Sequence, residues 1–142
     1  MMTRLIGSYQ HNIDQKGRVI IPAKYRESLG EVFYVTCGTD GCLFVMPEQQ
    51  IAVIEERIAA LPISQTSGFQ RMFYSLASEC QPDKQGRILI PQVLRDYAGL
   101  EKDVTIIGAG THLEIWNSES WSKAQSNINP EDFLSLMSNI GL

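Results

Sequence analysis

The sequence predicts an α+β fold, mainly β, in which two internal repeats pair as a pseudo-twofold β-barrel. The first observation is a repeated motif, since DQKGRVIIPAKYRESLG at residues 14–30 is matched by DKQGRILIPQVLRDYAG at residues 83–99. The match continues beyond the motif at an offset of 70 residues, where Gly38 pairs with Gly108 and Leu43 with Leu113. Each copy is too small to bury its apolar face alone, and closure into a barrel would leave no exposed sheet edges.

The first copy predicts a strand, a turn, a second strand and a short helix. Residues 8–13 show the partial alternation of a short strand. In the turn that follows, Asp14 can accept hydrogen bonds from the backbone after it, and Gly17 can adopt a positive φ at little cost. Pro22 ends the β-branched strand RVII at residues 18–21 and suits the first position of a helix, which Gly30 closes as a left-handed cap.

The second copy repeats this order, with a turn at 83–86, a strand RILI at 87–90, a helix at 91–98 and Gly99 as its cap. Each copy then ends in a hairpin, and these four strands are expected at residues 32–37, 42–46, 104–107 and 113–116. Because RVII and RILI are apolar without alternation, we expect both faces of these two strands to be covered inside the barrel.

Helical segments follow each copy. After the first, apolar residues at helical spacing predict two helices separated by Pro62, with stripes at Ile51, Ile54, Ile58 and Leu61 and at Phe69, Met72, Phe73 and Leu76. After the second, residues 119–128 occupy the matching position. A last helix is predicted to begin with Asn129 as its cap and Pro130 as its first residue, and to bury Phe133, Leu134, Met137 and Ile140. These stripes indicate packing in the core or between subunits.

The charge is unevenly distributed along the chain. The net charge of −4 is typical of a protein that does not bind polyanions, yet residues 14–30 carry +2, residues 83–99 carry +1, and the remainder carries −7. A fold that places both motifs on one face would give a basic surface on an acidic body. That local field matters more to a ligand than the total charge does.

Composition and motifs argue against several classes of function. No apolar run approaches the roughly 20 residues of a membrane span, and the polar N-terminus has no signal-peptide pattern. An odd number of cysteines, Cys37, Cys42 and Cys80, suits a reducing cytosol rather than a disulfide framework. His11 and His112 are the only histidines, and neither lies in a nucleophile or metal-binding motif. We therefore expect a protein without catalytic activity, metal or cofactor.

The residues of the turns point to a polyanion as the ligand. Arg18 and Arg87 directly follow a turn glycine, at the solvent end of a strand, where a planar guanidinium can reach a phosphate or the O6/N7 edge of guanine. Lys16 and Lys84, at the tips of the turns, suit nonspecific phosphate contacts. These four side chains are the candidate DNA-binding residues.

The aspartates of the same turns carry the wrong charge for DNA. We expect Asp14 and Asp83 to accept backbone and arginine hydrogen bonds that hold each turn and orient its arginine, with Gly17 and Gly86 giving the turn its shape. The alternative is that each Asp–Arg pair is a local ion pair that only stabilises its turn. A surface pair contributes at most roughly 1 kcal/mol, which is a weak reason to repeat a whole motif.

The two copies are not equally basic. The turn lysine is third in DQKGR and second in DKQGR, and Lys24 is replaced by Val93, so the first turn is expected to contribute more to salt-dependent affinity. Arg26 and Arg95 lie inside the short helices, where pairing with acids such as Glu27, or packing of the alkyl stem, is favoured over DNA contact.

The doubled motif resembles the MraZ family. The residues that carry the resemblance are DxKGRxxIPAxxR in the first half, DxxGRxLIPxxLRxxAGL in the second and the SGFQRMFYSLASE segment between them, so it covers nearly the whole chain. It implies a swapped-hairpin fold of the SpoVT/AbrB type, with one repeat at residues 8–55, a second at 78–121 and a C-terminal helix at 122–142. It also implies DNA binding through two DxxxR motifs, Asp14 to Arg18 and Asp83 to Arg87.

By this resemblance the protein is expected to be a transcriptional regulator, a repressor of its own division and cell-wall operon, that binds short direct repeats in double-stranded promoter DNA. It would act as a ring-shaped homo-oligomer in the cytoplasm, associated with the nucleoid and not with a membrane. Linking several weak DNA-binding subunits in one ring would raise the affinity for tandem repeats. The competing hypothesis is an oligomeric scaffold without specific DNA binding, which the acidic composition slightly favours.

Overall fold

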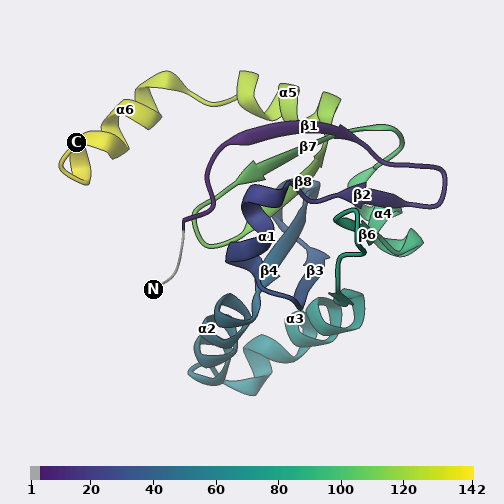
Figure 1. Ribbon diagram of the computed structural model, residues 1–142. Helices are drawn as coiled ribbons and strands as arrows, with labels where there is room; N and C mark the ends of the chain where they lie inside the picture. Colours follow the sequence, from purple (N-terminus) through teal and green to yellow (C-terminus); the bar gives the residue numbers. More distant parts are fainter. Residues whose placement is uncertain (1–3) are drawn as a thin grey trace.

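The computed structural model describes residues 4–142, which form an α+β fold with one large antiparallel sheet (Figure 1). In chain order its elements are β1 (Ser8–Asn12), β2 (Arg18–Ile20), α1 (Ala23–Leu29), β3 (Phe33–Cys37), the 3-10 turn η1 (Thr39–Gly41), β4 (Leu43–Pro47), α2 (Glu48–Ala59), α3 (Ile63–Leu76), β5 (Ser78–Cys80), β6 (Arg87–Leu89), α4 (Gln92–Ala98), β7 (Asp103–Gly108), β8 (Leu113–Asn117), α5 (Ser118–Ser126) and α6 (Pro130–Asn139).

The two copies of the motif are interleaved in this sheet. Its strand order is β1-β7-β8-β4-β3-β5, so the two hairpins β3–β4 and β7–β8 lie at the centre and meet through β4 and β8. The outer strands come from the opposite copy, because β1 pairs with β7 and β5 pairs with β3. The sheet stays open, and β2 and β6 form a separate two-stranded ribbon, so the closed barrel expected from the sequence is not formed.

The main core lies between one face of the sheet, the β2–β6 ribbon and helices α1 and α4. The strands contribute Val35, Val45, Ile106 and Ile115, the ribbon contributes Val19 and Ile88, and the helices contribute Tyr25, Leu29, Leu94 and Ala98. Both copies contribute equivalent side chains to this core, so neither copy could form it alone.

The ribbon contacts this core with one face only. Val19 and Ile88 are buried, but Ile20 is 40% exposed and Leu89 is 56% exposed. The expectation that RVII and RILI would be covered on both faces is therefore wrong. Successive side chains of a strand point to opposite faces, and nothing among the described residues covers the outer face of this ribbon.

The short helices begin one residue later than predicted. Pro22 and Pro91 occupy the N-cap positions of α1 and α4, in an extended conformation that the proline ring allows. Gly99 closes α4 in the left-handed conformation as expected. Gly30 has a positive φ but an extended ψ, so it is not the left-handed cap that the sequence indicated.

Helices α2 and α3 cover the opposite face of the sheet beside β3 and β4. There Met46, Ile51 and Phe73 form a second, smaller buried cluster. The hydroxyl of Thr36 on β3 donates a 2.9 Å hydrogen bond to the carbonyl of Phe73 on α3, which fixes the position of that helix on the sheet. The outer side of the helical pair leaves Leu61, Phe69 and Met72 exposed.

Helix α6 does not bury the residues predicted for it. Phe133, Leu134 and Ile140 are 58%, 62% and 66% exposed, and Met137 is only partly covered. Figure 1 shows the reason, since α6 extends away from the sheet beyond α5 instead of folding back onto it. Asn129 caps the helix through its side chain and Pro130 opens it, as the sequence indicated.

Candidate nucleic-acid interface

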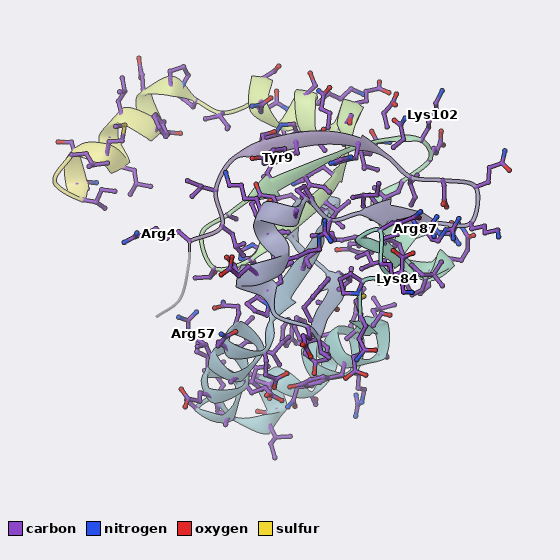
Figure 2. The ribbon with its side chains drawn as sticks, viewed as in Figure 1. Arg4, Tyr9, Arg57, Lys84, Arg87 and Lys102 are labelled. Atoms are coloured by element: carbon purple, nitrogen blue, oxygen red, sulfur yellow. The ribbon has the colours of Figure 1, made fainter. Side chains whose placement is uncertain are left out.

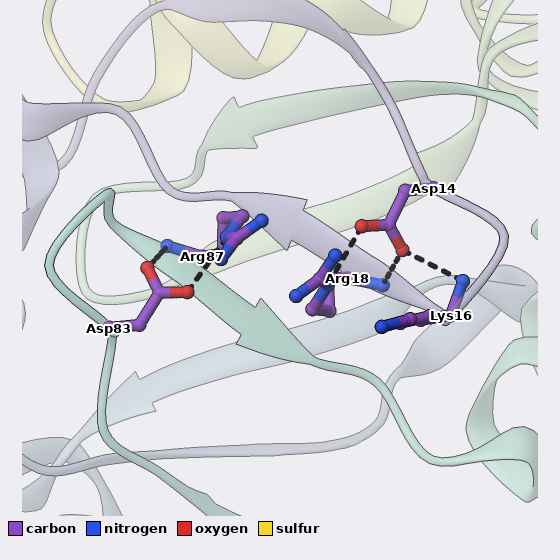
Figure 3. A network of polar contacts seen from close by, with 5 residues as sticks. All are labelled: Asp14, Lys16, Arg18, Asp83 and Arg87. Carbon is purple, nitrogen blue, oxygen red and sulfur yellow. Dashed lines mark hydrogen bonds and ion pairs between the residues drawn. The ribbon is translucent and has the colours of Figure 1, made fainter.

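The two DxxxR motifs form loops of the same geometry, loop 1 (Asp14–Arg18) and loop 2 (Asp83–Arg87). In loop 1, Oδ1 of Asp14 accepts hydrogen bonds from the backbone N–H groups of Lys16 at 2.9 Å and Arg18 at 2.8 Å. Its Oδ2 accepts one from Nε of Arg18 at 2.8 Å (Figure 3). Each aspartate thus holds both the turn and the guanidinium that follows it.

Loop 2 repeats these contacts one for one. Oδ1 of Asp83 accepts from the backbone of Gln85 and Arg87, each at 2.9 Å, and Oδ2 accepts from Nε of Arg87 at 2.7 Å. Because only Nε of each arginine is used in this pair, the terminal guanidinium nitrogens of Arg87 and Arg18 have donors left for a ligand.

These contacts keep the aspartates ionised. The backbone N–H of Arg18, followed by its side chain, lowers the pKa of Asp14 below the ordinary value, and Arg87 does the same for Asp83. Both carboxyl groups are therefore negative throughout the neutral range, and the loop geometry does not depend on pH there. The same geometry fits a purely structural ion pair, so it does not by itself assign a ligand to the loops.

The ribbon places both arginines on one solvent-exposed face. In the β2–β6 register Arg18 lies opposite Leu89 and Ile20 lies opposite Arg87, with Val19 and Ile88 between them. Because side chains alternate along a strand, these four residues share the outer face while Val19 and Ile88 point into the core. The two arginines are diagonal neighbours, a relation that separates side chains by roughly 7–8 Å. Figure 3 shows them side by side over the ribbon.

Each loop is supported by the other copy of the motif. The backbone N–H of Ile90 donates to the carbonyl of Gly17 at 2.8 Å, and the N–H of Ile21 donates to the carbonyl of Gly86 at 2.9 Å. The guanidinium of Arg95 lies directly against Gly17, and that of Arg26 lies against Gly86. The position of each loop therefore depends on both copies.

We expect Gly17→Ala and Gly86→Ala each to lower the free energy of unfolding by about 1–2 kcal/mol, because both glycines have a positive φ that L-residues adopt at this cost. A Cβ at position 17 would also lie 2.6 Å from Cζ of Arg95, and one at position 86 would lie 2.7 Å from Cζ of Arg26. Urea denaturation measures both effects.

Gly68→Ala is the matched control for these substitutions. Gly68 lies inside α3 with no atom within 4 Å of an added Cβ, so alanine there is expected to leave stability unchanged or to raise it by up to about 1 kcal/mol. If Gly17→Ala proved no more destabilising than Gly68→Ala, the described support of loop 1 by Arg95 would be wrong.

Arg26 and Arg95 are thus positioning residues of the loops and are not on the outer face of the ribbon. Nε of Arg95 donates to the carbonyl of Ile90 at 2.9 Å, whereas Nε of Arg26 is buried without a hydrogen-bond partner. Of the two alternatives expected for Arg26, pairing with Glu27 is absent from the ion pairs of residues 4–142. The two loops are therefore alike in their own contacts but not in their support.

Lys24 also lies apart from the loops. Its ammonium group donates to the hydroxyl of Tyr9 at 3.2 Å and lies 5.6 Å and 5.9 Å from the ring centroids of Tyr9 and Tyr25. The charge of +2 counted for residues 14–30 therefore overstates what loop 1 presents. The cations of that loop are Arg18 and the exposed Lys16.

Other cations are divided between two sides of the molecule. Figure 2 shows Lys84, Arg87 and Lys102 on one side, and Arg4 and Arg57 on the other. Lys102 precedes β7, and its carbonyl accepts a 2.8 Å hydrogen bond from the N–H of Ile13, next to loop 1. Lys84, Arg87 and Lys102 therefore lie on the side of the ribbon and the loops, whereas Arg4 and Arg57 lie away from it.

Sequence reasoning missed three residues of this surface: Ile20, Leu89 and Lys102. Ile20 and Leu89 each come two residues after an arginine in the same strand. Because strand side chains alternate between faces, each could have been placed on the same face as that arginine. Lys102 lies in the connection that precedes β7, and only the exchange of β1 between the copies brings it near loop 1.

Within residues 4–142, no helix has the length and apolar character needed to cross a membrane. The same part of the chain contains no group of three or more histidine, cysteine, aspartate or glutamate side chains arranged to hold a metal ion.

Fold and site together define a two-repeat protein whose interleaved copies present a pair of aspartate-held arginines on an exposed ribbon. Comparison with known sequences agrees with this class. A family model described as "MraZ protein, putative antitoxin-like" matches the chain twice, at residues 5–73 and 72–136. The chain therefore belongs to the MraZ family.

Individual relatives are similar over nearly their whole length. The chain is 54% identical over 127 residues to a protein of Heliobacterium modesticaldum, covering 88% of this chain and 89% of the relative. It is 46% identical over 142 residues to one of Caldicellulosiruptor saccharolyticus, covering 97% and 99%. A relative from Limosilactobacillus reuteri is 50% identical over 124 residues, covering 86% and 87%. All three are named transcriptional regulator MraZ, and none of these names describes an enzyme.

Proposed function

We propose that this protein is a DNA-binding transcriptional regulator that reads promoter DNA with the outer face of the β2–β6 ribbon. The observation that carries the proposal is the common exposed face of Arg18 and Arg87, each held by an aspartate four residues earlier. The names of the relatives support the same class of function.

A two-stranded ribbon is one of the two elements that fit the major groove of B-DNA. With its inner face on the core, the β2–β6 ribbon would enter the groove with Arg18 and Arg87 leading. Their diagonal spacing of roughly 7–8 Å is close to two base-pair steps, so each guanidinium could contact the O6/N7 edge of a different guanine. Ile20 and Leu89, between them, suit contacts with thymine methyl groups.

The remaining residues of the loops have supporting roles in this proposal. Lys16 and Lys84 neutralise phosphates on either side of the groove and set the register of the protein on DNA. Asp14 and Asp83 fix the guanidinium planes before DNA arrives, so that less rotamer freedom is lost on binding.

In keeping with the family resemblance, we place this ribbon in a swapped-hairpin fold of the SpoVT/AbrB type and in a ring-shaped homo-oligomer. The ring would bind short direct repeats in the promoter of its own division and cell-wall operon and repress it. The protein would then be cytoplasmic and associated with the nucleoid.

The test is the binding of the purified protein to its own upstream region and to a shuffled fragment of equal length, measured by fluorescence anisotropy at several salt concentrations. We expect the promoter fragment to bind at least about 10³-fold more tightly, as specific sites do. With two phosphate-neutralising lysines per subunit, log K is expected to fall with log[salt] with a slope of about −2 per engaged subunit, because each contact releases counterions.

A shuffled fragment that binds as well as the promoter at every salt concentration would contradict specific recognition. Absence of binding to either fragment by a fully assembled protein would instead favour the oligomeric scaffold.

A further inference from the structure

Because of the duplication, α2 in the first half and α5 in the second are equivalent helices on the face of the sheet opposite the main core. Only in the first half does a further helix cover the apolar residues beside this helix. In the first half α2 follows β4, and α3 folds back so that Phe73 packs on Met46 and Ile51. Ile54 packs against the same cluster. Phe73 is 4% exposed there, so α3 completes a closed apolar layer over this end of the sheet.

In the second half the equivalent layer is open. At the offset of 70 residues, Met46, Ile51, Ile54 and Ile58 correspond to Trp116, Trp121, Ala124 and Ile128, and these four residues line a groove of about 620 Å³ beside α5. The centroids of the two tryptophan rings, both part of its lining, lie 5.3 Å apart. Ile128 is 56% exposed, whereas its counterpart Ile58 is 9% exposed. The groove has an apolar lining but lacks the helix that covers it in the first half.

Helix α6 has the connection length and the apolar face that a covering helix needs. Three residues, 127–129, separate it from α5, as residues 60–62 separate α3 from α2. At the resulting offset of 67, the apolar residues Phe133, Leu136, Met137 and Ile140 correspond to Thr66, Phe69, Gln70 and Phe73 of α3. Ile140 thus occupies the position of Phe73, the residue that fills the first site.

We propose that α6 of one chain docks into the α5 groove of a second copy of this chain, with Ile140 between Trp121 and Ala124. A second copy is favoured because α6 extends away from α5 and the sheet of its own chain (Figure 1), while Phe133, Leu136 and Ile140 stay exposed on it. The proposed contact is mainly apolar, because the groove is lined by one cation, Lys123, which pairs with Glu119 at 3.4 Å, and by one anion, Asp40.

This contact joins two different surfaces of the molecule, because α6 of one chain packs into the α5 groove of the next. Such a heterologous contact forms closed rings when the rotation between neighbours permits it. It therefore supplies an interface for the proposed ring, although its existence does not depend on DNA binding and is tested without DNA.

The direct test is a disulfide between copies. Chains carrying Ala124→Cys and chains carrying Ile140→Cys, distinguished by an affinity tag on one of them, are co-expressed in a Cys37→Ser background and oxidised. Cys42 and Cys80 are buried, and burial raises their pKa to about 12 and about 11, so they do not compete as thiolates.

We expect a covalent dimer that contains one tagged and one untagged chain. Ser135→Cys in place of Ile140→Cys is the control, because it lies on the opposite side of α6, and its yield is expected to be at least several-fold lower. A chain carrying both Ala124→Cys and Ile140→Cys that closes only an internal disulfide, with no link between copies, would overturn the proposal by showing that α6 folds onto its own groove.

The independent readout is the mass of the assembly, measured by light scattering during size-exclusion chromatography. Leu136→Asp with Ile140→Asp is expected to raise the concentration needed for assembly by at least about 100-fold, because two large apolar contacts are lost. Ser135→Asp with Ser138→Asp adds the same charge on the other side of the helix and is expected to leave the mass unchanged. A wild-type mass for the Leu136 and Ile140 variant would also overturn the proposal.

Discussion

Replacing Arg18 and Arg87 by alanine in the same chain is expected to reduce affinity for the promoter by at least about 100-fold and to remove the preference for promoter over shuffled DNA. Each bidentate arginine–guanine contact discriminates by roughly 1–3 kcal/mol, and every subunit of an assembly would lose two such contacts. The assembly itself should persist, because both side chains lie on the outer face of the ribbon and each makes its ion pair with the aspartate of its own loop. Fluorescence anisotropy with both fragments, alongside light scattering, measures the two effects.

The matched control is Arg4→Ala with Arg57→Ala. It removes the same charge from exposed positions on the other side of the molecule (Figure 2), so it is expected to change promoter affinity only slightly. If the Arg18 and Arg87 variant bound the promoter as the wild-type protein does, the ribbon would not be the DNA-binding surface. The Asp14–Arg18 and Asp83–Arg87 ion pairs would then serve only to stabilise the loops.

Arg18→Lys with Arg87→Lys separates shape from charge. Lysine keeps the positive charge but lacks the planar fork that contacts two acceptors of guanine at once. We expect this variant to retain most of the affinity for shuffled DNA and to lose most of the preference for the promoter. Retention of that preference would mean that the arginines act as point charges on phosphates.

The candidate site was predictable to the extent that it is encoded by local contacts. Asp14 and Gly17 define a turn through bonds to residues at most four positions away, and the repetition at Asp83 and Gly86 shows that the turn is used twice. The two loops lie at opposite ends of the ribbon, but the approach of Arg18 to Arg87 followed from the need of two incomplete copies to share a core.

What could not be predicted depends on which strands pair across the copies. Arg26 and Arg95 look alike in sequence, yet their position against Gly86 and Gly17 arises only because β2 of one copy pairs with β6 of the other. The same pairing decides that Ile20 and Leu89 face outward. From their apolar character alone, Ile20 and Leu89 would be predicted to be buried. Only the register of the β2–β6 ribbon shows that they face outward.

The prediction of a closed barrel failed for a related reason. The prediction assumed that strands rich in β-branched residues are covered on both faces, as in parallel sheets. In the structure the ribbon is too short to continue the sheet, and each of its two strands has three residues. It packs across the core and leaves β1 and β5 as the edges of an open sheet.

Separating the subunits with Leu136→Asp and Ile140→Asp is expected to reduce affinity for a promoter fragment that carries its direct repeats in tandem by about 10²–10⁴-fold, and to leave affinity for a single repeat nearly unchanged. Within an assembly the first bound ribbon holds the next one close to its repeat, so later contacts are intramolecular and the affinities multiply. A separated subunit keeps Arg18 and Arg87 on its ribbon but loses this gain. Footprinting defines the single repeat, and anisotropy on both fragments measures the difference, with Ser135→Asp and Ser138→Asp as the control. Equal losses on both fragments would place α6 in the binding of each repeat and not in the linkage of subunits, because linkage has no effect on a DNA that offers one site.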